Sequence, residues 1–175
     1  EGVRLFLLTS HYRSPLNYGE EQLEAARLAL ARLYTALRGL PTAVEVGGGA
    51  DFEARFHAAM EDDFNTPEAI AALFDLAREV NRVRASDAQE AARLGSRLRA
   101  LGGVLGLLQR DPDRALQQGA PAGALDDAQI EALIRERDEA RRRRDWAAAD
   151  RVRDRLQEAG VILEDGSGGT TWRRG

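Results

Sequence analysis

The sequence predicts a mainly α-helical protein, in which an antiparallel four-helix bundle is followed by a small α+β module of two helices and a β-hairpin. Apolar residues recur at spacings of three and four over most of the chain, which is the period of an amphipathic helix. The stretch QGAPAG at 118–123 carries neither this periodicity nor charge, which is typical of a domain boundary. After it, two further helical patterns precede two short β-like runs around a glycine-rich turn.

The first part of the chain contains two helical segments. The apolar run from Leu5 to Tyr12 resembles the last turns of a helix. Asn17 and Glu20 have the form of a capping box, which predicts the start of the next helix. That helix continues through apolar positions at helical spacing until Gly39 and Pro41. These positions are Leu23, Ala26, Leu30, Leu33 and Leu37.

With the helix that starts near Asn17, three more helices complete the predicted four-helix bundle. The first has Phe52, Phe56, Ala59 and Met60 on one face. In the next, Thr66 is expected to be the N-cap and Pro67 the first helical residue. The last runs from about Asp87 to Leu108 with an interruption at Gly102–Gly103, and Pro112 ends it. The preceding Gly47–Gly49 run is a linker rather than a phosphate loop, because no serine, threonine or lysine follows it.

The module after the boundary has a smaller set of apolar residues. Ile130, Leu133 and Ile134 line one helix. A second helix begins at Asp145, ends at Gly160 and carries Trp146, Ala149, Val152 and Leu156. Two strands, Val161–Leu163 and Thr170–Trp172, are expected to form a hairpin. A domain of about 50 residues buries little surface, so we expect this module to depend on other contacts.

Composition excludes several classes of chemistry. Of 175 residues, 43% are hydrophobic and 31% are charged, and no run is long and apolar enough to span a membrane. Cysteine is absent and the two histidines are isolated, which disfavours a metal site. Every one of the 25 basic residues is arginine, so lysine-based catalysis and the P-loop lysine are excluded. We expect a soluble, cytoplasmic protein with no catalytic residue, no metal and no cofactor in this chain.

Charge is unevenly placed along the chain. The net charge is −4, yet Arg135–Arg155 contains nine arginines and six acidic residues. Arg141, Arg142, Arg143 and Arg144 are consecutive, so on a helix they point in four directions and some should reach a neighbour or a partner. Arginine hydrogen-bonds phosphates and base edges, and Trp146 offers a stacking surface for bases. In the alternative interpretation the arginines form a solvated face and Trp146 belongs to the core. The acidic balance argues against DNA as a partner.

Other polar residues carry less information. Glu61, Asp62 and Asp63 are clustered acids at a helix end without a metal or histidine partner, which favours solvated surface over catalysis. Since Glu1 is not methionine, we expect the chain to be a piece of a longer protein.

Four blocks of the sequence, in collinear order, closely resemble the C-terminal half of bacterial cysteinyl-tRNA synthetases, which are class I aminoacyl-tRNA synthetases. The blocks are SHYRSPLNYGEEQLEAAR (10–27), MEDDFNTPEAIAALFDLAREVNR (60–82), LGGVLGLLQ (101–109) and the terminal stretch 130–174. The resemblance divides the chain into the end of a linker from a catalytic domain (1–18), a helical bundle of the DALR type (19–118), a linker (119–124) and an anticodon-binding module (125–175).

The resemblance implies a function in tRNA recognition. In this family, ATP-dependent attachment of cysteine to tRNA(Cys) occurs on an N-terminal domain with HIGH and KMSKS signatures and a zinc ion, none of which this chain contains. The chain alone is therefore expected to be inactive in aminoacylation, to bind tRNA(Cys) and to be a monomer. A related cysteine ligase of mycothiol synthesis needs no anticodon reader, so the terminal module favours the tRNA enzyme.

The resemblance also assigns site residues. The family's anticodon contacts correspond to Arg141, Trp146, Asp150, Arg153 and Asp165. Asp150 and Arg153 are three residues apart on one helix face, so an ordinary salt bridge is the alternative for them. His11 and Arg13 are expected either to contact the inner corner of the tRNA or to pack against the catalytic domain. Arg142, Arg143 and Arg144 are further candidate tRNA contacts.

Two other classes of function stay open from the sequence. One is a freestanding RNA-binding module. The other is a helical protein-interaction scaffold, in which the arginine run is surface charge.

Overall fold

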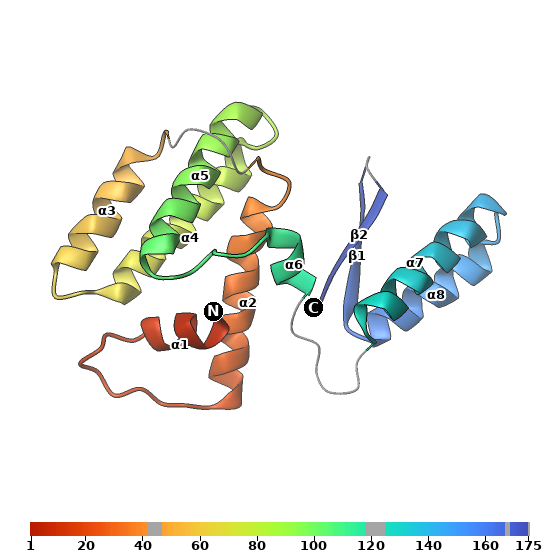
Figure 1. Ribbon diagram of the computed structural model, residues 1–175, viewed down its shortest axis with the longest axis horizontal. Helices are drawn as coiled ribbons and strands as arrows, with labels where there is room; N and C mark the ends of the chain where they lie inside the picture. Colours follow the sequence, from red (N-terminus) through yellow and green to blue (C-terminus); the bar gives the residue numbers. More distant parts are fainter. Residues whose placement is uncertain (42–46, 118–124, 167–168, 175) are drawn as a thin grey trace. The chain divides into compact units, whose positions relative to one another are not determined.

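The computed structural model describes residues 1–41, 47–117, 125–166 and 169–174. This part of the chain is mainly α-helical with one small hairpin, which confirms the predicted fold class (Figure 1). Two compact units are present, Glu1–Pro112 and Asp113–Gly175. The elements are α1 (Gly2–Leu8), α2 (Glu20–Leu37), α3 (Ala50–Glu61), α4 (Thr66–Val83), α5 (Ala88–Val104), α6 (Pro112–Gln117), α7 (Asp127–Arg142), α8 (Trp146–Glu158), β1 (Val161–Gly166) and β2 (Gly169–Arg174).

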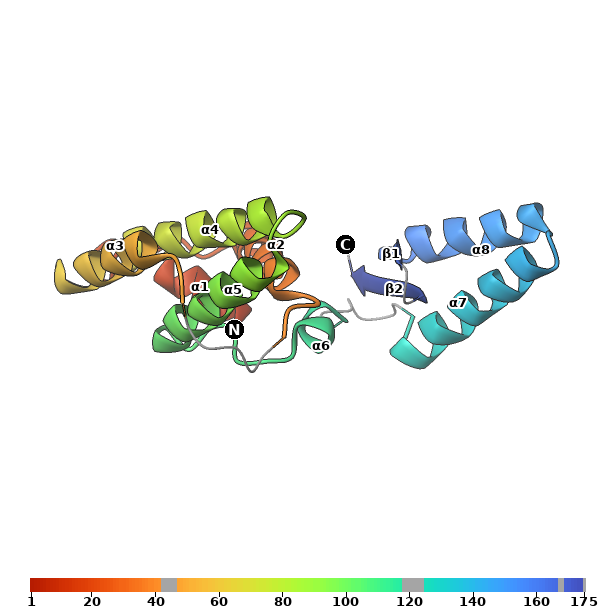
Figure 2. The same cartoon turned by 90° about the horizontal axis from the view of Figure 1, so that it is seen from above.

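The first unit is a helical bundle. Helices α3, α4 and α5 lie side by side, α2 packs on α4, and α1 packs on α2 (Figures 1 and 2). The apolar stripes seen in the sequence form its core, because each stripe faces a neighbouring helix. Fully buried side chains of this core include Leu33, Leu37, Phe56, Leu73, Leu76 and Leu98.

Several predicted helix boundaries were wrong. The N-cap of α4 is Asn65 and not Thr66, since the Asn65 side chain accepts a hydrogen bond from the Glu68 backbone (3.3 Å). Pro67 is therefore the second helical residue and not the first. Asn17 and Glu20 form no capping box: Gly19 is the N-cap of α2, with extended backbone and no side-chain hydrogen bond.

The ends of two other helices also differ from the prediction. The first helix ends at Leu8 rather than Tyr12. Helix α5 includes Gly102–Gly103 and ends at Val104 rather than Leu108. Left-handed backbone at Gly106 (φ 67°) and Leu108 (φ 61°) turns the chain away there. The short helix α6 was not predicted, because Pro112 was interpreted only as a stop.

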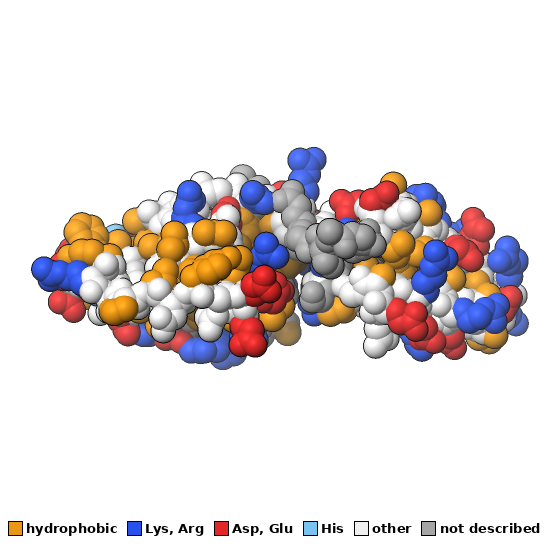
Figure 3. All heavy atoms as spheres, turned by 90° about the horizontal axis from the view of Figure 1, so that it is seen from below, with side chains coloured by type: hydrophobic (Ala, Val, Ile, Leu, Met, Phe, Trp, Pro, Cys, Tyr) orange, Lys and Arg blue, Asp and Glu red, His pale blue; other side chains and the backbone are white. Residues whose placement is uncertain are grey.

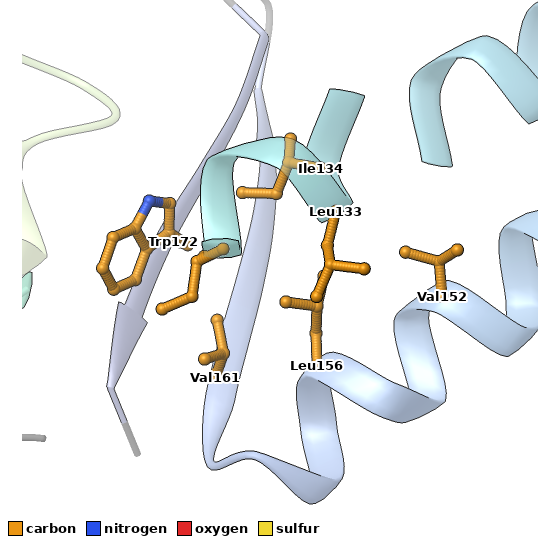
Figure 4. Packing of buried hydrophobic residues seen from close by; sticks show 7 residues of the cluster. Leu133, Ile134, Val152, Leu156, Val161 and Trp172 are labelled. Carbon is orange, nitrogen blue, oxygen red and sulfur yellow. The ribbon is translucent and has the colours of Figure 1, made fainter. Parts of the chain in front are cut away.

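The second unit contains the α+β module. Helix α7 packs on α8, and α8 packs on β1 (Figure 1). The strands pair antiparallel from Val161↔Arg174 to Gly166↔Gly169, so the predicted hairpin is present with longer strands. Its core consists of Ile130, Leu133, Ile134, Val152, Leu156, Val161 and Trp172, contributed by both helices and both strands (Figure 4).

Some expectations lie outside the described residues. The predicted linker at 119–124, the boundary stretch 118–123 and the tip of the hairpin turn at 167–168 belong to this group. Among the helices that the structure describes, none has the length and apolar character needed to cross a membrane.

Candidate nucleic-acid interface

Four of the five predicted anticodon contacts lie on the α7–α8 helical hairpin. Its tight turn ends α7 with Arg144 in the left-handed conformation (φ 60°). The Arg144 backbone N–H donates to Arg141 (3.0 Å) and that of Asp145 donates to Ala140 (2.9 Å), which are the two bonds of a Schellman motif. The Asp145 side chain then caps α8 by accepting from the Ala148 backbone (3.0 Å).

Trp146 is the first residue of α8 and lies on the surface. Its side chain is 60% exposed, whereas Ala149, Val152 and Leu156 of the same helix are buried. The expectation that Trp146 belongs to the apolar stripe of this helix was therefore wrong. The tryptophan of the module core is Trp172, which is 3% exposed. An exposed indole at a helical turn is available to stack on an unpaired base.

Asp150 and Arg153 form an exposed pair on α8. Arg153 Nη1 lies 3.4 Å from Asp150 Oδ1, and the two side chains are 55% and 62% exposed. Arg153 also lies 3.4 Å from Asp154. Both functional groups thus face solvent in a defined mutual arrangement, one as donor and the other as acceptor.

Asp165, on the hairpin, is joined to α7 by a network that the sequence did not reveal. Arg137 donates two parallel hydrogen bonds to its carboxylate (3.1 and 2.8 Å), and Thr170 donates a third (2.7 Å). Arg141 donates a fourth, longer one (3.3 Å). The hydrogen bonds from Arg137 and Thr170 hold the pKa of Asp165 well below its ordinary value, so the carboxylate is ionised.

Arg137 is the arginine of this network that sequence reasoning missed. Its side chain is only 10% exposed. The hydrogen bond to Asp165 raises its pKa above the ordinary value, and the charges of Asp138 and Asp150 add to this effect. A signal was present in the sequence: Arg137 continues the apolar stripe of Ile130, Leu133 and Ile134, where an arginine is unusual unless it is paired.

The remaining arginine candidates fall into two groups. Arg142, Arg143 and Arg144 are exposed and form no ion pair within the described residues, so they are available to phosphates. Arg13 lies in the first unit, where its guanidinium is 2.7 Å from Asp63, and Tyr12 donates to the same carboxylate (2.7 Å). His11 Nε2 is 3.1 Å from the Asp63 backbone oxygen. Arg13 and His11 therefore hold two segments of the bundle together.

The charges around the module are mixed in sign. On the face that Figure 3 shows, basic and acidic side chains are interspersed over the part formed by α7 and α8. Such a surface favours recognition by particular side chains over a broad electrostatic field. No group of three or more potential metal ligands occurs within the residues described.

Two family models match the sequence. The DALR domain matches residues 55–109, and the cysteinyl-tRNA ligase anticodon binding domain matches residues 125–173. The chain is 60% identical over 174 residues to the cysteine–tRNA ligase of Cronobacter sakazakii. It is 59% identical to those of Erwinia tasmaniensis and Escherichia coli K12. These matches include 99% of this chain and 38% of each relative, so the chain spans under two fifths of their length.

Along the chain, the DALR match precedes the anticodon-binding match. The chain therefore belongs to the cysteine–tRNA ligase family and contains the DALR and anticodon-binding domains from the C-terminal part of these enzymes.

Proposed function

We propose that this chain binds tRNA(Cys) and that its C-terminal module reads the anticodon. The observation that carries the proposal is the exposed indole of Trp146 at the α7–α8 turn, in a module that also presents two solvent-accessible arginine–aspartate pairs, one within α8 and one between α7 and β1. An unstacked anticodon base needs both a flat surface and hydrogen-bonding groups for its edges. This module offers both.

Each side chain then has a chemical role. Arg141 and Arg153 donate to base acceptors such as O6, N7 or O2. Asp150 and Asp165 accept from a guanine N1–H and N2 amine or from a cytosine N4 amine. Trp146 stacks on one base and thereby orients its edge.

The exposed arginines of the turn have a different role. Arg142, Arg143 and Arg144 contact phosphates, which adds affinity without sequence information. This contribution weakens as salt is added, because each phosphate contact releases a counterion.

The activity of the longer relatives is proposed for the whole protein. It joins cysteine to tRNA(Cys) using ATP, with ATP and zinc bound outside the present 175 residues. The protein acts as a monomer in the cytoplasm, and the chain alone has no aminoacylation activity. In the whole protein, the role of this chain is to select the tRNA.

Binding to tRNA tests the proposal. The chain is titrated with a tRNA(Cys) transcript and with the same transcript carrying one changed anticodon base, at two salt concentrations. We expect the matched tRNA to bind about tenfold more tightly, which corresponds to about 1.4 kcal/mol. Equal binding with steep salt dependence would limit the module to a nonspecific contact, and absence of RNA binding would favour a protein scaffold.

A further inference from the structure

The carboxylate of Asp165 has its acceptor positions occupied by side chains of its own chain. Oδ1 accepts from Arg137 Nη1 (3.1 Å) and Thr170 Oγ1 (2.7 Å). Oδ2 accepts from Arg137 Nη2 (2.8 Å) and Arg141 Nη1 (3.3 Å). An ionised carboxylate has about four lone-pair sites. A base can therefore hydrogen-bond to Asp165 only after one of these partners has left.

The partners differ in how firmly they are held. Arg137 is 10% exposed and uses its planar fork for two parallel hydrogen bonds, so its departure would leave a buried charge unpaired. Thr170 stands directly opposite Asp165 in the hairpin register, and its hydroxyl also lies 3.3 Å from Arg137 Nη1. Both contacts are thus fixed by the fold.

Arg141 is the exception. Its side chain is 45% exposed and makes one hydrogen bond to Asp165, at 3.3 Å, which is longer than the usual N–H···O distance. An exposed ion pair of this kind contributes little to stability because water replaces it at low cost. Arg141 can therefore leave Asp165 without disturbing the network behind it.

We infer that Arg137 is a positioning residue for anticodon reading, which together with Thr170 fixes Asp165, while Arg141 is the partner that an RNA base displaces. The inference rests on the proposed function. On binding, the Arg141–Asp165 hydrogen bond breaks and Oδ2 accepts an N–H of the base. The freed guanidinium donates to a base or phosphate oxygen. No proton is transferred in this exchange of hydrogen bonds.

Charge explains why a buried arginine suits this position. A lone carboxylate would repel the phosphates of an approaching RNA. The buried Arg137 guanidinium compensates the charge of the Asp165 carboxylate. Asp165 Oδ2 can therefore accept a hydrogen bond from the base. Lysine would supply the charge but not the two parallel hydrogen bonds that fix the carboxylate plane.

Two substitutions and a matched control test this role. Arg137→Lys keeps the charge and removes the fork, and Thr170→Val removes only the hydroxyl. Arg135→Lys makes the same chemical change at an exposed position of the same helix. Each full chain is titrated with the tRNA(Cys) transcript and with the transcript carrying one changed anticodon base. Discrimination by the unsubstituted chain is measured first.

We expect Arg137→Lys and Thr170→Val each to reduce the ratio of the affinities for the matched and the changed tRNA by about threefold or more. The reduction should come mainly from weaker binding of the matched tRNA. Binding of the changed tRNA should stay within about twofold, because phosphate contacts are retained. Arg135→Lys should leave both affinities unchanged.

Every other outcome is decisive. If the unsubstituted chain does not discriminate, the proposed function fails and the inference fails with it. If the unsubstituted chain discriminates and the folded variants have the same ratio of affinities for the matched and the changed tRNA, Arg137 is not a positioning residue. If the variants bind both tRNAs more weakly by the same factor, the inference is overturned as well, since such a loss shows a purely electrostatic or structural effect. Should Arg137→Lys fail to fold, Thr170→Val, which keeps the ion pair, decides.

The displacement of Arg141 has its own test in the absence of RNA. Both tryptophans of the sequence, Trp146 and Trp172, lie in this module, so their fluorescence reports its unfolding. Arg141→Leu should lower the Tm by less than about 2 °C, and Arg137→Lys by about 4 °C or more. Equal losses would show that Arg141 is held as firmly as Arg137 and would contradict its displacement.

Discussion

The two units of the molecule each contain an arginine–aspartate pair at almost the same distance, but the pairs differ in burial. In the bundle, Arg13 lies 2.7 Å from Asp63 and the side chains are 69% and 46% exposed. In the C-terminal module, Arg137 lies 2.8 Å from Asp165 and the side chains are 10% and 48% exposed. Distance alone would rank the pairs equal. Because only Arg137 is buried, we expect the loss of one partner to lower the free energy of unfolding strongly in the module and only slightly in the bundle.

The difference extends to how each unit is stabilised. Long apolar stripes on several helices form the core of the bundle, and hydrogen bonds between polar groups at its surface join further segments to it. One example is Glu1, whose carboxylate accepts from Tyr34 Oη (2.7 Å) and from the Leu108 and Gln109 backbone (3.1 Å each). The module has a small core and places a charged network directly beside it. Its stability and its recognition chemistry therefore share residues.

The largest effect on stability is expected from the module core. Leu156→Ala removes a fully buried side chain and should cost about 2–5 kcal/mol. Because the module is small, this loss should strongly destabilise or unfold it, as seen in tryptophan fluorescence. The bundle has a separate core and should retain its helical circular dichroism. Loss of both signals together would show that the two units do not fold separately.

The second prediction separates the two ion pairs. Arg137→Met should lower the free energy of unfolding of the module by about 2–3 kcal/mol, less than for a fully buried pair because Asp165 is half exposed. Arg13→Met should cost the bundle less than about 1 kcal/mol. Denaturant unfolding followed by fluorescence and circular dichroism measures both. Equal costs would refute the role assigned to burial.

Acid should affect the module through Asp165. Its pKa is lower in the folded state than in the unfolded chain, so its stabilising contribution is present above the unfolded value and is lost as the pH falls through the folded value. The free energy of unfolding should therefore decline below about pH 4. Asp165→Asn should remove this part of the decline, whereas Asp63→Asn in the bundle should leave the tryptophan-detected curve unchanged.

A smaller effect is expected at the helix ends of the module. Helices α7 and α8 are both followed by a left-handed residue, Arg144 (φ 60°) and Gly160 (φ 72°). Arg144→Gly should stabilise the module by about 0.5–1 kcal/mol, and Gly160→Ala should destabilise it by a similar amount. Thermal unfolding of both variants tests this. A stabilising Gly160→Ala would contradict the conformational explanation.

The smallest effect on stability is expected for the exposed pair on α8. Asp150→Asn should change the free energy of unfolding by less than about 0.5 kcal/mol, since the side chain is solvated. Discrimination between matched and changed tRNA should nevertheless fall by about fivefold or more. Asp154→Asn, next to the same arginine, is the matched control and should leave discrimination unchanged.

Periodicity was sufficient to predict the longer helices but not the short helix α6, because burial of one face of a long helix determines both the pattern and the fold. Exact helix starts were less predictable: Asn65 and Thr66 are both good N-caps, and backbone geometry decides between them. Trp146 was ambiguous for a similar reason, since its distance from Ala149 fits the stripe but its place at the turn leaves it in solvent. Arg137 could not be assigned without the hairpin that brings Asp165 to α7.

Fluorescence of Trp146 can show whether the α7–α8 turn and the β-hairpin form the anticodon site. The chain and its Trp146→Phe variant are titrated with an anticodon stem-loop of tRNA(Cys) and with a stem-loop carrying a changed anticodon. We expect the matched stem-loop to quench the fluorescence at lower concentration than the changed one, and the variant to lose this quenching. Tight binding of the matched stem-loop without any change in Trp146 fluorescence would contradict this assignment of the anticodon site.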